Sequence, residues 1–248
     1  MTTPETTVRL NAYIASNSQL SRRAADDLIS AKKVWINGAV ATLGQRVNAD
    51  DEVIYENDAR TLVTIGEQAN ITTLLLYKPI EYVSTRTDPQ ERKTIYDLLP
   101  KELHHLKNAG RLDTMSEGLI VMSNDGNLIH TLTHPKNDHK KRYLVRTNRE
   151  LVGRDMQTMS QGVVLEDGYK TKPIEINVLD EVTRKQFGYL RLPLDEYWYI
   201  FTLYEGRNRQ IRNILRAVDK RVARLIRVQH GDFVLTEAVV KQGYLVVN

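Results

Sequence analysis

The chain of 248 residues contains no cysteine, so disulfide bonds and metal sites with thiolate ligands are excluded. No apolar run approaches the roughly 20 residues that a membrane-spanning helix needs. The N-terminal stretch MTTPETTVRL also lacks the apolar core of a signal peptide. From these absences we expect a cytoplasmic protein without a membrane partner.

The usual cofactor motifs are missing as well. The chain has no GxxxxGK[ST] phosphate loop, no GxGxxG dinucleotide fingerprint and no GxSxG nucleophile elbow. His130 and His134 have the i, i+4 spacing of a metal pair, but they lack the glutamate of HExxH and an acidic cluster. We therefore expect neither a cofactor nor a metal, and we favour a surface or structural role for the two histidines.

Positive charge is concentrated in three segments, although the net charge is only +4. Residues 205–227 carry +6, residues 136–149 carry +5 and residues 9–46 carry +4. Separated basic segments can form an electrostatic footprint for nucleic acid, but solvated helix faces would have the same composition. Charge alone leaves both interpretations open.

The order of helix and hairpin signals in residues 9–55 predicts a compact folded unit. Ser21 is a good N-cap for a helix over RRAADDLIS, after an earlier helix with Leu10 and Ile14 on one face. In VWINGAVAT, Asn37-Gly38 between two short β-prone runs predicts a hairpin. We place a first domain at residues 1–60, a linker at 61–70 and a second domain at 71–248.

The second domain mixes strands and helices without strict βαβ alternation, which predicts an α+β fold with a mixed or antiparallel sheet. Amphipathic spacing in RNRQIRNILRAV predicts a helix. Several β-rich runs predict strands, namely ITTLLLYK, GLIVMS, KRYLVRT, KPIEINVLDEV, FGYLRLPL and EYWYIFTLYE.

Asp113 in GRLDTMSEGL is the most unusual carboxylate, because it stands between a basic loop and a strand that is apolar throughout. Arg111 and Asp113 flank Leu112, so in an extended loop their side chains project the same way. An arginine near such an aspartate would keep the carboxylate ionised. The sequence alone leaves Asp113 as either a turn residue or a reactive group.

Four ordered segments, GRLDTMSEGLIVMSNDG, KRYLV, EGRNRQIRNIL and VARLIRVQHGDFVL, resemble the RsuA type of RNA pseudouridine synthase. The first unit, RLNAYIASNSQLSRRAADDLISAKKVWINGAVA, resembles the S4 RNA-binding domain that precedes the catalytic domain in that family. KNDHKKRYLV and NRQIR look most like its RluF-like branch, which modifies large-subunit ribosomal RNA. The resemblance covers nearly the whole chain.

The resemblance implies an enzyme that isomerises a uridine to pseudouridine without a cofactor, in 23S ribosomal RNA. It implies that Asp113 is the catalytic aspartate, that Tyr143 packs against the target base, that Arg212 pairs with the aspartate and that Leu225 lines the uracil pocket. Arg111 matches a loop arginine that displaces the base. The chain departs from the family pattern at Ser116-Glu117, Glu81 and Asn213, which affects RNA contacts more than chemistry.

We expect RNA to be the partner and the protein to act as a monomer. The candidate RNA contacts are the basic and polar residues of the two motif regions, namely Arg9, Arg22, Arg23, Lys32, Asn37, Arg111, Arg207, Arg209 and Gln210. Three alternatives stay open: the same chemistry on 16S ribosomal RNA or a tRNA anticodon stem-loop, a non-catalytic S4-type assembly protein, and a glycosidic hydrolase. The hydrolase would need a second carboxylate that activates water.

Overall fold

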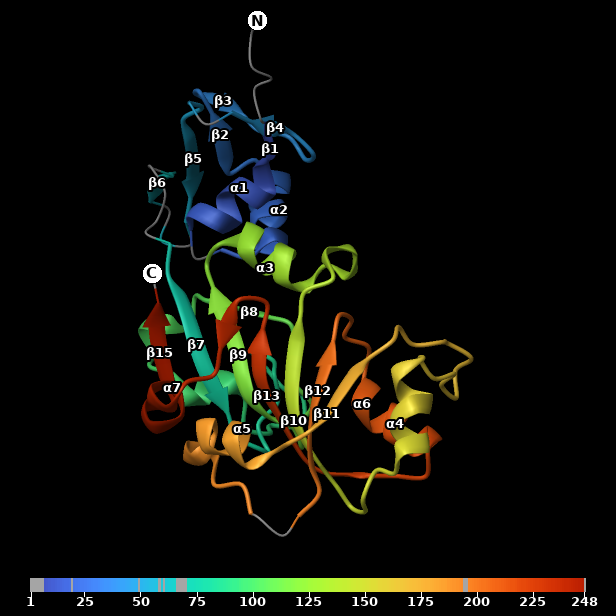
Figure 1. Ribbon diagram of the computed structural model, residues 1–248. Coiled ribbons are helices and arrows are strands. Elements are labelled where there is room, and N and C mark those ends of the chain that lie inside the picture. Colours follow the sequence, from blue (N-terminus) through green and yellow to red (C-terminus); the bar gives the residue numbers. More distant parts are fainter. Residues whose placement is uncertain are drawn as a thin grey trace, which may run out of the picture. The chain divides into compact units, whose positions relative to one another are not determined.

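The computed structural model describes residues 7–18, 20–48, 50–57, 59, 61–65, 71–193 and 196–247. The chain divides into two compact units, residues 1–71 with 124–126, and residues 72–123 with 127–248. Figure 1 shows the elements of both units.

The first unit combines two helices with a four-stranded sheet, and the sequence predicts the two helices and the hairpin. The Ser21 hydroxyl accepts a hydrogen bond from the amide of Ala24 at 3.0 Å and so caps the second helix. Asn37 and Gly38 both have positive φ, 49° and 80°, which is the geometry of the predicted hairpin turn. The sheet has the order β3-β2-β5-β6, and β1 pairs with β4. The elements are α1 (Leu10–Asn17), α2 (Arg22–Ser30), β1 (Val8–Arg9), β2 (Val34–Ile36), β3 (Ala39–Val40), β4 (Arg46–Val47), β5 (Val53–Glu56) and β6 (Leu62–Ile65).

Strand β6 lies inside the segment 61–70 that the sequence predicts as a linker. It pairs antiparallel with β5, with Glu56 opposite Leu62. These residues therefore belong to the sheet of the first unit, and residues 66–70 lie outside the described residues. The exact domain boundary stays a prediction.

The second unit is built on one large mixed sheet, in agreement with the predicted α+β class. Its strand order is β11-β12-β10-β13-β9-β7-β15, with β14 beside β13 and β8 beside β9. Every pairing in it is antiparallel except the one between β13 and β9. The strands are β7 (Thr73–Lys78), β8 (Lys107–Ala109), β9 (Glu117–Ser123), β10 (Lys141–Thr147), β11 (Glu175–Val178), β12 (Trp198–Leu203), β13 (Val222–His230), β14 (Phe233–Val234) and β15 (Tyr244–Val247).

Helices cover both faces of this sheet, which is why its central strand β9 is buried along its whole length. One face packs on residues of α3, η4 and α7, and the other on residues of α4 and α6. Figure 1 shows α4 and α6 on the side of the sheet where β11 and β12 lie. The helices are α3 (Gly126–Thr133), α4 (Gly153–Ser160), α5 (Glu181–Gln186), α6 (Gln210–Ala217) and α7 (Glu237–Gln242), with short 3₁₀ turns η1 (Ile95–Leu98), η2 (Lys101–Leu103), η3 (Pro135–Asn137) and η4 (Gly188–Leu190).

One predicted strand is wrong. FGYLRLPL does not form a strand in its described part, because the chain enters helix α5 and then the turn η4. Asp180 begins α5: its carboxylate accepts a hydrogen bond from the amide of Thr183 at 2.7 Å. That N-cap ends the strand of KPIEINVLDEV early, at Val178.

The strand alternation of β9 sends neighbouring side chains to opposite faces. Leu119 and Val121 join one core cluster, together with Ile226 of β13. Ile120 and Met122 join another, on the face where Leu112 and Tyr143 also pack. By the same alternation Glu117 lies on the face of Leu119, away from Tyr143.

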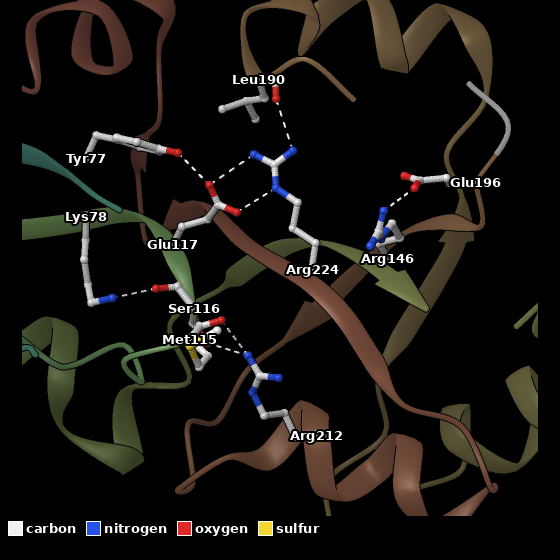
Figure 2. Close-up of polar contacts among 10 residues, drawn as sticks. All are labelled: Tyr77, Lys78, Met115, Ser116, Glu117, Arg146, Leu190, Glu196, Arg212 and Arg224. Carbon is white, nitrogen blue, oxygen red and sulfur yellow. Dashed lines mark hydrogen bonds and ion pairs between the residues drawn. The ribbon is translucent and has the colours of Figure 1, made fainter. Parts of the chain in front are cut away.

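Glu117 is a buried partner of Arg224, as Figure 2 shows. Arg224 donates from Nε to Oε1 at 2.6 Å and from Nη2 to Oε2 at 3.1 Å. The Tyr77 hydroxyl donates to Oε2 at 2.6 Å. Burial, and then the hydrogen bond to Glu117, raise the pKa of Tyr77, so the phenol remains a donor. The sequence could not explain the negative charge of Glu117, and these contacts do.

Gly118 lies where β9 meets β13. Its φ is 110°, and a Cβ added there would meet the carbonyl oxygen of Arg227 at 2.4 Å and its nitrogen at 2.6 Å. Both atoms are backbone atoms of the paired strand, with Arg227 opposite Gly118 in the parallel register. Only glycine fits this position without moving one strand away from the other.

We expect Gly118→Ala to destabilise the protein by about 2–4 kcal/mol, because the added methyl group forces the two backbones apart and strains φ. The free energy of unfolding from urea titration checks this. Gly153→Ala is the control: it begins α4 and has nothing within 4 Å of the added Cβ. Equal stability of the two variants would contradict the packing argument.

We expect Glu117→Ala to cost about 2–3 kcal/mol of stability, because it leaves the half-buried Arg224 guanidinium without its carboxylate. Thermal and urea unfolding measure the loss. Glu237→Ala is the matched control, since Glu237 pairs with Lys241 on an exposed helix surface and should cost well under about 1 kcal/mol. A Glu117 variant as stable as this control would refute the structural role.

Candidate active site

The loop that carries Asp113 connects β8 to β9 and is fixed at Leu112. The Ser84 hydroxyl donates to the carbonyl of Leu112 at 2.8 Å and accepts from its amide at 3.1 Å. The Leu112 side chain is buried in the core cluster beneath. Arg111 is exposed on one side of this anchor and Asp113 is partly exposed on the other.

The other side of Asp113 is held by Lys78, whose side chain is fully buried. Its ammonium group donates to the carbonyls of Pro79 at 2.9 Å, Ser116 at 2.6 Å and Thr114 at 3.3 Å. Burial lowers the pKa of Lys78 to about 8, while Asp113 and Glu117 oppose the shift. Figure 2 shows the contact with Ser116. The backbone around the aspartate is therefore held by buried groups and not by solvent.

Arg212 reaches the loop from α6. Its Nη2 donates to the carbonyl of Met115 at 2.7 Å and lies 3.3 Å from Ser116 Oγ (Figure 2). Its Nε lies 3.8 Å from Asp113 Oδ2, with 15% of the Arg212 side chain and 27% of the Asp113 side chain exposed. Burial, and then Arg209, lower the pKa of Arg212, and Asp113 opposes this. The guanidinium remains charged at neutral pH.

Tyr143 and Leu225 complete the site from the sheet. Leu225 lies opposite Val145 in the antiparallel pairing of β10 with β13, so Tyr143 and Leu225 project from the same face. Leu225 is 6% exposed and Tyr143 is half-buried. Both line a cleft of about 770 Å³ together with Asp113 and Arg212. The structure therefore brings together the four residues that the sequence assigns to catalysis, from four separate parts of the chain.

Three predicted RNA contacts, Arg111, Arg207 and Arg209, line the same cleft and are exposed. Gln210 differs from them. It is 4% exposed, its side-chain nitrogen donates to Glu205, and its Oε1 accepts from the Arg207 amide at 3.0 Å. Gln210 thus holds the loop together and does not offer a free group to RNA.

Sequence reasoning missed one wall of the cleft, formed by the loop after β7. Ser84, Thr85 and Arg92 line the cleft from this loop. Asp88 accepts from Arg92 Nη2 at 2.7 Å, and this interaction holds the pKa of Asp88 at about 2. The loop has no motif of its own in the sequence, and its place in the cleft follows only from the path of the chain.

The other predicted RNA contacts lie in the first unit. Arg22 and Arg23 form the first turn of α2, and both are exposed. Arg9 and Lys32 are exposed at the ends of helices α1 and α2. Asn37 lies at the hairpin tip, where its amide donates to Asp51 at 2.8 Å and its Oδ1 accepts from the Glu52 amide at 2.9 Å.

The described residues contain neither a metal centre nor a membrane span. No group of three or more His, Cys, Asp or Glu side chains there is arranged to hold a metal ion. No helix in this part of the chain has the length and apolarity to cross a bilayer.

The chain is similar to known proteins over nearly its whole length. Residues 72–217 match the RNA pseudouridylate synthase family, and residues 8–53 match the S4 domain. Ribosomal large subunit pseudouridine synthase B of Salmonella typhi is 33% identical over 244 residues, covering 95% of this chain and 78% of that protein. The protein of the same name from Escherichia coli K12 gives the same identity and coverage.

A solved structure described as a pseudouridylate synthase aligns with a TM-score of 0.64 and 28% identity, covering 97% of this chain and 96% of that one. The family match spans more than half of the chain and includes Asp113, Tyr143 and Arg212. The chain therefore belongs to the RNA pseudouridylate synthase family, as an enzyme whose catalytic domain is preceded by an S4 domain.

Proposed function

We propose that this protein isomerises a specific uridine to pseudouridine in large-subunit ribosomal RNA, with Asp113 as the catalytic carboxylate. The observation that carries the proposal is the meeting of Asp113 and Arg212 in a cleft that Tyr143 and Leu225 also line. The RNA class comes from the names of the relatives, which are large-subunit enzymes. The finer RluF-like placement stays a prediction.

The reaction requires groups that this cleft contains. The N1–C1′ bond of uridine breaks, uracil rotates, C5 bonds to C1′, the hydrogen on C5 leaves as a proton, and N1 takes up a proton. Asp113 either attacks C1′ or removes the 2′ proton, and an ionised carboxylate serves both routes. The Tyr143 ring and the Leu225 side chain hold the detached base by stacking and apolar contact, with stacking worth about 1–3 kcal/mol.

The same cleft offers little support for hydrolysis. A hydrolase needs a second carboxylate free to activate water. The two other carboxylates that line the cleft are engaged: Asp88 with Arg92, and Glu205 with Tyr169 and Gln210. Asp113 is the carboxylate that this cleft leaves available for chemistry.

The first unit supports the proposal through Arg22 and Arg23. Cations in the first turn of a helix are unfavourable to the helix itself, because the macrodipole is positive there. The same N-terminus attracts anions, and two exposed arginines add to the attraction. We infer that this turn contacts RNA phosphates. A ribosomal RNA substrate is consistent with a cytoplasmic protein, and a monomer stays our expectation for the oligomeric state.

Pseudouridine mapping of total RNA, from cells with and without this protein, tests the assignment directly. A single uridine of the large-subunit RNA should lose its modification when the protein is absent. If the modification is lost from 16S ribosomal RNA or tRNA instead, the proposed reaction stands and the proposed RNA substrate is wrong.

We expect Asp113→Asn to lower kcat by about 10⁴-fold or more, because it removes the reacting group, while RNA affinity stays within about threefold. Tritium release from RNA labelled at uridine C5 measures the reaction, and filter binding measures affinity. Asp232→Asn, an exposed turn residue, is the control. Near-normal activity of Asp113→Asn would sink the assignment.

We expect the double variant Arg22→Ala, Arg23→Ala to raise the apparent KM for RNA by about tenfold and leave kcat unchanged, because phosphate contacts add affinity and no chemistry. The dependence of RNA affinity on salt should weaken at the same time. An unchanged KM and salt dependence would show that this turn does not touch RNA.

A further inference from the structure

Glu205 is an acidic residue on the wall of the cleft that we propose to receive RNA phosphates. Its negative charge would repel those phosphates unless it is neutralised by other groups. Its carboxylate is not free. Oε2 accepts from the Tyr169 hydroxyl at 2.8 Å, and Oε1 accepts from the Lys172 amide at 3.0 Å and from the Gln210 side chain. Three donors from two segments of the chain thus hydrogen-bond to both carboxylate oxygens and stabilise the negative charge within the protein.

These contacts continue to Arg207. The Gln210 amide that donates to Glu205 also accepts, through Oε1, from the Arg207 backbone amide at 3.0 Å. The Gln210 backbone nitrogen in turn donates to the Arg207 carbonyl at 3.2 Å. Glu205 therefore fixes the backbone of Arg207 through one intermediate side chain.

Tyr169 fixes the side chain of Arg207. The guanidinium lies over the Tyr169 ring, 3.7 Å from its centroid. Its Nη2 is 3.2 Å from Asp167, and 43% of the side chain remains exposed. The hydrogen bond to Glu205 raises the pKa of Tyr169, so its hydroxyl keeps its proton for this contact.

The platform beneath Arg207 is itself a tight turn. The Leu165 amide donates to the Tyr169 carbonyl at 2.8 Å, and the Gly168 amide donates to the Leu165 carbonyl at 2.9 Å. Asp167 Oδ1 also accepts from the Tyr169 amide at 3.1 Å. The ring is therefore held in place before any RNA arrives, which lowers the entropy lost on binding.

We propose that Glu205 is a positioning residue that holds Arg207, through Gln210 and Tyr169, in place to bind an RNA phosphate beside the target uridine. The inference rests on the proposed function, because it assigns a role in binding that substrate. Glu205 contributes to RNA affinity through Arg207 alone. It takes no part in the chemistry at Asp113.

The test measures tritium release from total RNA labelled at uridine C5, prepared from cells that lack the protein. We expect Glu205→Gln to raise the apparent KM by about tenfold, with kcat within about twofold of wild type, because one phosphate contact is lost. The slope of log RNA affinity against log salt should fall by about 1. The control is Glu166→Gln, in the turn that carries Tyr169, where the Glu166 side chain is 81% exposed. It should leave KM, kcat and the salt dependence unchanged.

A double-mutant cycle with Arg207→Ala separates positioning from a general effect on folding. If Glu205 acts through Arg207, Glu205→Gln adds nothing to the KM of Arg207→Ala. The inference is overturned if the two substitutions raise KM independently, so that their effects multiply in the double variant. It is also overturned if Glu205→Gln has the KM of the wild type, or if it lowers kcat and leaves KM unchanged.

Misfolding of Glu205→Gln and a lack of activity in the wild-type protein have different consequences. If Glu205→Gln loses its cooperative melting transition, Tyr169→Leu replaces it, because that change removes the ring under Arg207 from a half-exposed turn. It should raise KM about tenfold, and an unchanged KM would overturn the inference. Absence of tritium release by the wild-type protein would instead refute the proposed function, and RNA affinity alone would then test Glu205.

Discussion

The parallel pairing of β9 with β13 is the constraint on which the active site depends. It places Glu117 opposite Ile226 and Gly118 opposite Arg227, with backbones so close that a side chain at residue 118 has no room. The Asp113 loop enters β9 at this point. A parallel register therefore brings the aspartate to the level of Leu225, while the antiparallel pairing with β10 adds Tyr143 on the same face.

Charge in the second unit follows a consistent arrangement. Glu117 is turned to the far face of the sheet and paired with Arg224, Asp88 is paired with Arg92, and Glu205 is saturated by three donors. A surface that must approach phosphates keeps its remaining cations exposed, among them Arg207 and Arg209. Among the carboxylates that line the cleft Asp113 is the exception, because its ion pair with Arg212 is loose, at 3.8 Å, and 27% of its side chain is exposed.

Local signals in the sequence predicted local structure well. Ser21, the Asn37-Gly38 turn and the apolar spacing of α6 each act within a few residues, and the structure confirms all three. The failure at α5 has a local cause too, because Asp180 was an available N-cap next to a β-rich run. At Ser21 and at Asp180 a capping group decided where the helix begins, more than the propensity of the residues that follow it.

Long-range contacts could not be predicted from spacing. Met115 and Arg212 are 97 positions apart, and only the fold reveals that the arginine donates to a backbone carbonyl. That contact has a chemical consequence. A bidentate arginine pair would cover the Asp113 oxygens, whereas a guanidinium held by Met115, with its Nε 3.8 Å from the carboxylate, supplies charge and leaves the oxygens accessible. The loose pair therefore suits the reaction with the sugar that we propose for Asp113, and a tighter pair would hinder it.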